Sequence, residues 1–328
     1  MQKCFVGCLI VWGMGVPEFS FRYKIRNWSE YNRALVHRGQ LTLWFDETAL
    51  AAWRYTARSS GPGRPKVYAG AAIERVLVLK SVFHLSLRAT QGFLESVVTL
   101  MGLDLPVPDY STMSRRQVGL EVSLRCRANA GARHVVVDAT GLRVYGAGEW
   151  HAGKYQHARR RAWRKLHLGV DEATREILAA DVTESRVHDS RRLPTLLLRM
   201  PDGIAQVSGD RGYDTRACYE AVLACGAVAT IVPRRNARVS RGVDPPAWRG
   251  ARDAMLRGIE GQGRYGWRMS SGCTRQSLAE NAMYRFKAAF GGKLWARTLE
   301  SQQIEAVIKC AVLNRMTGLG MPDTVRIL

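Results

Sequence analysis

Three acidic residues, Asp138, Asp210 and Glu280, occupy positions from which they could bind a metal ion. Asp138 ends the apolar run HVVVD (134–138), Asp210 follows a second apolar run, and Glu280 lies on a helix predicted over 277–290. Carboxylates at the ends of strands meet at one edge of a sheet, and a helix packed across that edge can add a third. Such oxygens suit Mg²⁺, and two ions can activate an attacking oxygen and stabilise a leaving one.

Each acid also has a purely structural interpretation. Asp138 could begin a turn, as acids after strands often do, and Asp210 could form an Asx turn before Gly212. Glu280 stands three residues after Ser277, which is the spacing of a capping box. Taken singly, these interpretations are the more frequent ones, so the metal-site hypothesis depends on the three acids occurring together.

The segments around these acids predict a mixed α/β sheet. The strand that ends on Asp138 is followed by alternating runs over 164–171 and 176–183, which predict a hairpin. Further strands are predicted over 204–208 and 227–232. Antiparallel strands followed by alternating helix and strand favour a mixed sheet with flanking helices. The helices expected around it cover 189–200, 214–224, 277–290 and 304–314.

The N-terminal part of the chain predicts helices. Apolar residues at helical spacing indicate helices over 69–84 and 87–101, and Ser111 is the predicted N-cap of a third. That third helix carries Arg115 and Arg116. Three short helices with arginine on the last are typical of a helix-turn-helix-like DNA-binding module, with a plain three-helix packing unit as the alternative.

The charge of the chain predicts a polyanionic partner. Lysine and arginine number 49 against 28 aspartate and glutamate residues, a formal net charge of +21 over 328 residues. Clustered cations gain binding free energy by releasing the counterions of nucleic acid. A solvated basic surface or a compositional bias towards arginine is the alternative. The phosphate-contacting residues predicted in the two basic stretches are Lys154, Arg160, Arg161, Arg164, Lys165, Arg234 and Arg235.

Several other classes of site are not expected. The seven cysteines are scattered without zinc spacing, which favours a reduced, cytosolic compartment. The histidines, among them His134 and His167, show no serine or aspartate partner pattern. The apolar run over 4–16 is too short to span a bilayer, so no membrane partner is expected. GGK (291–293) lacks the remainder of a phosphate-binding loop, so no nucleotide is expected.

A series of longer strings runs through the chain from about Tyr23 onward; examples are VVVDATGLRVYGAGEW (135–150), AQVSGDRGYDTRACYEA (205–221) and SLAENAMYRFKAAFG (277–291). In this order, the strings resemble the insertion-sequence-five group of bacterial DDE transposases. The resemblance implies a ribonuclease H-like catalytic domain with Asp138 and Asp210 as the catalytic aspartates. Glu280 corresponds to the glutamate of the signature Y-x2-R-x3-E-x6-K, and Lys287 to its lysine. The further matching strings cover 83–116, 160–183, 229–238 and 311–323.

The resemblance also implies an activity and partners. The protein would bind the terminal inverted repeats of its own element and then cleave and transfer DNA strands with two Mg²⁺ ions, for which Mn²⁺ could substitute. The implied partners are double-stranded DNA, at the element ends and the target, and a second copy of the chain on paired ends. Lys287 would contact a DNA phosphate, a surface lysine being the alternative. The implied location is the bacterial cytoplasm, in association with the nucleoid.

The predicted organisation has three parts. An irregular extension covers 1–22, a helical DNA-binding region covers 23–125, and the ribonuclease H-like domain covers 130–328. Within that domain, a basic and irregular segment is expected at about 234–270.

The signature is incomplete in this chain. Cys273 stands at its tyrosine position and Gln276 at its arginine position, although Arg275 is adjacent and is predicted to contact DNA. One alternative is therefore a catalytically decayed or recruited sequence-specific DNA-binding protein. A second alternative is a ribonuclease H-like nuclease that hydrolyses DNA without joining it.

Overall fold

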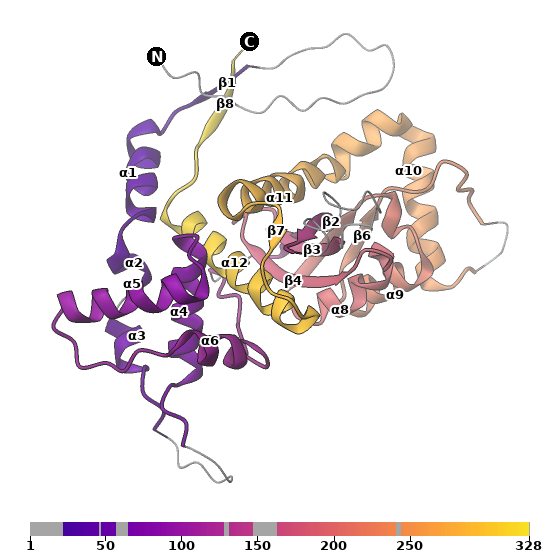
Figure 1. Ribbon diagram of the computed structural model, residues 1–328. Helices are drawn as coiled ribbons and strands as arrows, with labels where there is room; N and C mark the ends of the chain where they lie inside the picture. The colour runs from indigo at the N-terminus through magenta and orange to yellow at the C-terminus, as the bar shows by residue number, and fades with distance from the viewer. Residues whose placement is uncertain are drawn as a thin grey trace, which may run out of the picture.

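A group of N-terminal helices packs beside a larger domain built around a sheet, and a two-stranded ribbon brings the ends of the described chain together (Figure 1). The predicted extension over 1–22 lies, apart from Arg22, outside the described residues. In the ribbon, β1 (Arg22–Ile25) pairs antiparallel with β8 (Thr324–Ile327). The computed structural model describes residues 22–45, 47–56, 65–127, 131–146, 163–240 and 244–327.

The helices predicted near the N-terminus are confirmed. They correspond to α4 (Gly70–Val82) and α5 (Leu87–Leu100). The third helix begins two residues earlier than expected, because Asp109 and not Ser111 is its N-cap, accepting the N–H of Ser111 at 2.8 Å. The other helices of this region are α1 (Trp28–Arg38), α2 (Leu41–Trp44), α3 (Glu47–Ala51) and α6 (Tyr110–Gln117).

The central sheet is mixed and is flanked by helices, as predicted. Its strand order is β4-β3-β2-β5-β6, with β7 (Lys293–Leu294) pairing beyond this path with β2. β3 runs antiparallel to β2 and β4, whereas β5 and β6 run parallel to β2. The five strands are β2 (Arg133–Val144), β3 (Trp163–Asp171), β4 (Ile177–Glu184), β5 (Ile204–Gly209) and β6 (Val228–Ile231).

Both faces of the sheet are covered because alternate residues of its strands enter two separate cores. Leu166 and Leu168 belong to one core with residues of α11 (Ser277–Phe290) and α12 (Leu299–Leu319). Val135 and Val137 belong to the other, with residues of α8 (Leu193–Leu197) and α9 (Arg216–Ala224). The first core also contains residues of the N-terminal helices, so those helices and the sheet share one apolar interior.

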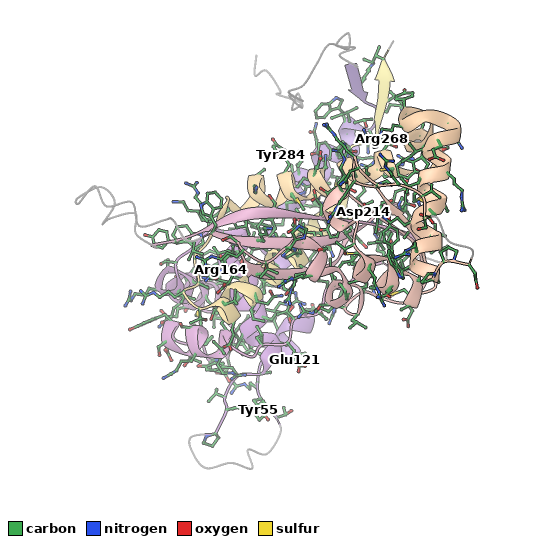
Figure 2. The ribbon with its side chains drawn as sticks, turned by 90° about the vertical axis from the view of Figure 1, so that its right-hand side faces the viewer. Tyr55, Glu121, Arg164, Asp214, Arg268 and Tyr284 are labelled. Atoms are coloured by element: carbon green, nitrogen blue, oxygen red, sulfur yellow. The ribbon has the colours of Figure 1, made fainter. Side chains whose placement is uncertain are left out.

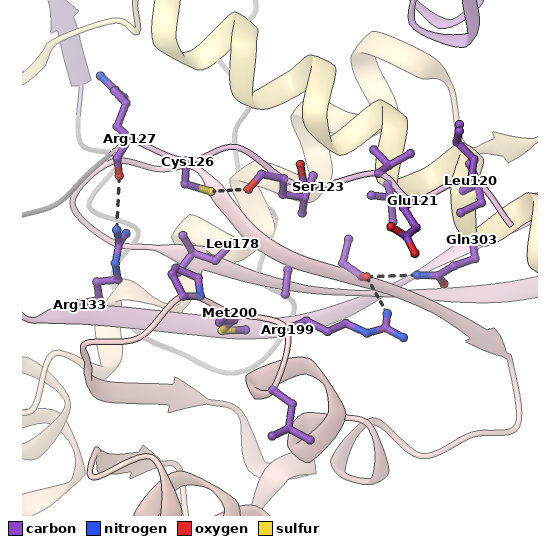
Figure 3. A pocket seen from close by; sticks show the side chains of 18 residues that line it. Leu120, Glu121, Ser123, Cys126, Arg127, Arg133, Leu178, Arg199, Met200 and Gln303 are labelled. Carbon is purple, nitrogen blue, oxygen red and sulfur yellow. Dashed lines mark hydrogen bonds between the residues drawn. The ribbon is translucent and has the colours of Figure 1, made fainter. Parts of the chain in front are cut away.

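The edge strand β4 is covered by amide side chains of α12. Asn314 accepts the N–H of Ile177 at 2.7 Å and donates to its carbonyl oxygen at 2.8 Å. Eleven residues earlier on the same helix face, Gln303 accepts the N–H of Val182 at 2.5 Å and donates to the carbonyl of Ala180. These amides replace a neighbouring strand and block pairing with another chain at this edge. Gln303 and Arg199 reach the same Ala180 oxygen in Figure 3.

The segment expected to be irregular over 234–270 is largely helical. Residues Ala247–Ser270 form α10, which is interrupted at Gly263, where φ is 71°. Its glycines and arginines weakened the periodic signal, but tertiary contacts hold it in place. The described helices include none that is long and apolar enough to cross a membrane.

Candidate active site

Asp138 lies inside strand β2, which continues to Val144 and does not end at Asp138 as predicted, whereas Asp210 directly follows the end of the neighbouring parallel strand β5. The register of β2 and β5 pairs Val136 with Ser208, so the same register two residues further on brings Asp210 beside Asp138. Asp210 keeps an extended backbone, with φ −75° and ψ −175°, before the short η2 turn (Arg211–Tyr213) begins. Adjacent strands are about 4.8 Å apart, so the two aspartates are neighbours at the point where β5 ends beside β2.

Helix α11 crosses the sheet at these aspartates and is fixed to β2 on both sides of Asp138. At its start, Gln276 donates to the carbonyl oxygen of Val137 at 2.9 Å. Near its end, Lys287 donates to Thr140 Oγ1 at 2.6 Å. Glu280, one turn after Gln276, is exposed on the helix between these contacts.

The predicted apolar stripe of α11 is confirmed. Met283, Phe286 and Phe290 are buried in the core beneath the helix. Tyr284, on the neighbouring face, is exposed and lies on the outer side of α11 in Figure 2. The packing of this apolar stripe therefore determines which side of α11 faces strand β2.

The electrostatics of Asp138 reflect the acids around it. Burial, together with the charges of Asp210 and Glu280, raises the pKa of Asp138 to about 6, against the opposing hydrogen bond from the Ala139 N–H. Asp189 contributes a smaller effect in the same direction. The ionised form of Asp138 is thus disfavoured, and a bound cation would relieve this cost.

The donor set fits a hard divalent cation, although its members are not gathered at ligand distance. Within the described ranges, no three histidine, cysteine, aspartate or glutamate side chains form a group that could already hold a metal ion. Asp138 Oδ1 accepts the Ala139 N–H at 2.7 Å, and Asp210 Oδ1 accepts the Gly212 N–H at 2.9 Å. Each aspartate therefore turns one oxygen to the backbone and has a second oxygen for another ligand.

The structural interpretations of the acids have different outcomes. Asp138 begins no turn, because β2 continues past it and pairs it with Leu168 of β3. The hydrogen bond from the Gly212 N–H shows that Asp210 does form the Asx turn. The capping box is absent, because the residue before α11 makes no side-chain cap bond and Ser277 Oγ donates to the Thr274 carbonyl oxygen instead. Glu280 is thus not needed to cap its own helix.

A small cavity lies next to Asp138, because Ala139 and Thr140 are among its lining residues. It encloses about 270 Å³, and its lining includes Thr140, Lys165 and Asp189. A larger groove of about 1050 Å³ lies elsewhere, between residues 120–127, β4 and the end of α8, and none of the three acids lines it (Figure 3). The larger volume of the groove therefore does not mark the candidate active site, which is identified by the positions of the three carboxylates.

Sequence reasoning missed a histidine network beside the site. His134 Nε2 is hydrogen-bonded to Ser208 Oγ at 2.7 Å, and its Nδ1 pairs with Glu172, which also binds Arg275 Nε at 2.7 Å. Serine, histidine and glutamate in this order could activate a nucleophile, but Ser208 is fully buried and cannot reach a substrate. The network joins β2, β5 and the start of α11. No local spacing could have revealed it.

A second missed residue is Asp214, whose side chain is completely buried. It accepts Arg252 Nε at 2.7 Å and the Arg234 N–H at 2.9 Å. Burial alone would raise the pKa of Asp214, but these hydrogen bonds lower it. Figure 2 shows Asp214 inside the domain, where it anchors α10 to the strand ends. Its place in the string SGDRGYDT was the available signal.

The predicted DNA-contacting residues fall into three groups. Arg115, Arg234 and Arg235 are exposed. Lys154, Arg160 and Arg161 lie outside the described residues. The others, besides Lys287, are engaged within the chain: Arg116 with the Tyr68 carbonyl oxygen, Arg164 with Gln302, Lys165 with Asp189 and Arg275 with Glu172.

Cys273 and Gln276, the residues that depart from the signature, both make contacts with the interior of the domain. Cys273 is buried, and burial raises the pKa of its thiol. Gln276 uses its Nε2 for the Val137 carbonyl oxygen, while its Oε1 is buried with no hydrogen-bond partner among the described residues. Gln276 therefore contacts the residue immediately before Asp138.

Two family models, each described as a transposase DDE domain, match this chain. One matches residues 36–147 and the other residues 129–315, which is more than half of the chain. A solved structure of a piggyBac transposase synaptic complex with hairpin DNA is similar at 12% sequence identity, with a TM-score of 0.27, over 86% of this chain and 80% of that chain.

Proposed function

Because the chain belongs to the family of DDE transposases, we propose that it is the transposase of an insertion sequence of the insertion-sequence-five group. In this proposal it binds the terminal inverted repeats of its element, cleaves their strands and joins them to target DNA. It acts on double-stranded DNA as a dimer on paired ends. The net charge of +21 supports a DNA partner.

Asp138, Asp210 and Glu280 would hold two divalent cations, Mg²⁺ in the proposal. When bound, such ions stabilise charge on the attacking and leaving oxygens of a phosphodiester. Asp138 would supply oxygens from within β2 and Asp210 from the end of β5, whereas Glu280 would supply one from α11. The Gln276 and Lys287 contacts with β2 keep that helix across the site.

The single observation that carries this proposal is the β2–β5 register with α11 fixed across β2, because it brings Asp210 and Glu280 towards Asp138. Burial and two like charges raise the pKa of Asp138 to about 6. An arrangement that disfavours its own ionised form has no structural benefit, but it favours capture of a cation.

The test is strand cleavage by Asp138→Asn on a duplex that carries the sequences flanking the gene. Loss of cation binding should lower cleavage roughly a thousandfold or more, because metal catalysis contributes several kcal/mol. Binding of the duplex should change only a few fold. Asp202→Asn, the same substitution at an exposed loop residue, is the matched control. Undiminished cleavage by Asp138→Asn would refute the assignment.

A DNA-binding protein without catalytic activity is the second candidate, and Gln276 favours it. The amide fills the position of the signature arginine and is bonded to the Val137 carbonyl oxygen. Absence of any Mg²⁺-dependent nick at the element's ends would support this candidate. A gain of cleavage in Gln276→Arg would indicate a decayed transposase.

A nuclease that does not join strands is separated from a transposase by its products. Incubation of pre-cut element ends with a supercoiled plasmid should yield joined molecules if the chain is a transposase. Shortened ends alone would identify the nuclease.

A further inference from the structure

The charges of three arginines act on one another where helix α1 rests on the catalytic domain. Arg38 comes from the last turn of α1, Arg285 from the middle of α11, and Arg175 from the turn between β3 and β4. Helix α1 lies beside the C-terminal end of α12 at this junction (Figure 1). Contact is close, since a Cβ on Gly320 would lie 3.0 Å from the Ala34 side chain.

The bonds of this arginine cluster are to neutral groups. Arg285 donates to Thr317 Oγ1 at 2.7 Å, and Arg38 donates to the carbonyl oxygen of Gly320 at 3.2 Å. Arg38 Nε is buried and has no hydrogen-bond partner in the described part of the chain. A buried N–H without an acceptor is a site at which an anionic oxygen would be stabilised.

Nearby carboxylates do not neutralise the cluster. Among the described residues, none of the three arginines forms an ion pair. Burial and the charges of Arg38 and Arg175 together lower the pKa of Arg285 to about 10, with Tyr31 opposing them. The acids of the adjoining turn are already paired with other arginines: Asp171 with Arg133, Glu172 with Arg275 and Glu176 with Arg127.

We propose that Arg38, Arg285 and Arg175 form a binding site for a single phosphate group of the DNA backbone. Guanidinium groups bind phosphate oxygens through paired N–H donors, which suits the unused Nε of Arg38. A phosphate held here would bridge α1 and the catalytic domain. The identity of the phosphate as DNA rests on the proposed function, whereas the anion site itself does not.

A structural role for these arginines is the rival explanation. Cations near helix C-termini are stabilised by the helix dipole, and Arg38 lies at the end of α1 and bonds beyond the end of α12. The two explanations predict opposite effects of removing a charge in the absence of phosphate. A capping arginine stabilises the fold by itself, but an unneutralised buried arginine does not.

The first measurement is thermal unfolding in chelator, with chloride replaced by inorganic phosphate at constant ionic strength. Arg285→Met should match or exceed the wild-type melting temperature in chloride and should lose the phosphate-specific gain. Arg38→Gln should lose that gain as well. The control is Arg33→Gln, which changes an exposed arginine on helix α1, the helix that carries Arg38. If Arg285→Met does not fold, Arg285→Lys replaces it in the experiment.

The second measurement is the salt dependence of duplex binding, again in chelator, so that the result does not depend on catalysis. Loss of one phosphate contact should lower the slope of log K against log salt by about 0.9 in Arg38→Gln and in Arg285→Met. Arg33→Gln should keep the wild-type slope. Lost phosphate stabilisation with an unchanged slope would overturn DNA as the ligand. Equal behaviour of Arg38→Gln and Arg33→Gln in both experiments would overturn the site.

Discussion

Replacing Asp138 with asparagine should make the metal-free protein more stable, although it removes a proposed metal ligand. Burial and neighbouring acids raise the pKa of Asp138 from its ordinary 3.8 to about 6. Between these values the folded protein binds more protons than the unfolded chain, so its stability falls as the pH rises through this window. Above pH 6 the whole cost is present, and an uncharged side chain avoids it.

The size of the gain follows from that difference. Each pKa unit corresponds to about 1.4 kcal/mol, so the cost of ionising Asp138 approaches about 3 kcal/mol at pH 8. Asparagine keeps an oxygen for the 2.7 Å hydrogen bond from the Ala139 N–H, though the bond to a neutral oxygen is weaker. We therefore expect a gain of about 1–3 kcal/mol in the free energy of unfolding.

Urea unfolding in chelator at pH 8 and pH 4 measures this gain. Asp138→Asn should be more stable than the wild type at pH 8 and close to it at pH 4, while Asp202→Asn should match the wild type at both. A gain of equal size at both pH values would show that charge is not its cause. A loss of stability at pH 8 would refute the reasoning.

Three further substitutions test the packing around the site. Phe286→Ala should lower the free energy of unfolding by about 3–5 kcal/mol in urea, because it empties a fully buried position under α11. Arg252→Met should cost about 3–5 kcal/mol at neutral pH by leaving Asp214 buried without its cation, and less below pH 4, measured in the same way. Gln303→Ala should cost about 1–3 kcal/mol and promote self-association, seen by light scattering, because the Val182 N–H at the sheet edge loses its acceptor. Unchanged stability in any of the three would contradict the contact it tests.

Periodicity was sufficient to predict the sheet and helix α11. The valines before Asp138 and the stripe of Met283, Phe286 and Phe290 are buried as their spacing indicates. Such patterns are local, because each element must present one apolar face to the core. The same signal placed Asp210 after a strand but ended the first strand at Asp138, whereas β2 continues to Val144 through residues of mixed polarity.

Long-range contacts were not predictable in the same way. His134 meets Ser208 across 74 residues and Glu172 across 38, with no sequence spacing to reveal the network. Helix α10 contains many glycines and arginines, and one of its anchors is the distant carboxylate of Asp214. Arg275, which is predicted to contact DNA, also pairs with Glu172, a partner that only the fold brings near.

The most direct test of the central claim is Mn²⁺ binding followed by electron paramagnetic resonance, with duplex DNA present. We expect binding to the wild type and to Asp202→Asn, with strong loss in Asp138→Asn and in Asp210→Asn. Equal Mn²⁺ affinity in all four proteins would contradict a metal site built on these two aspartates.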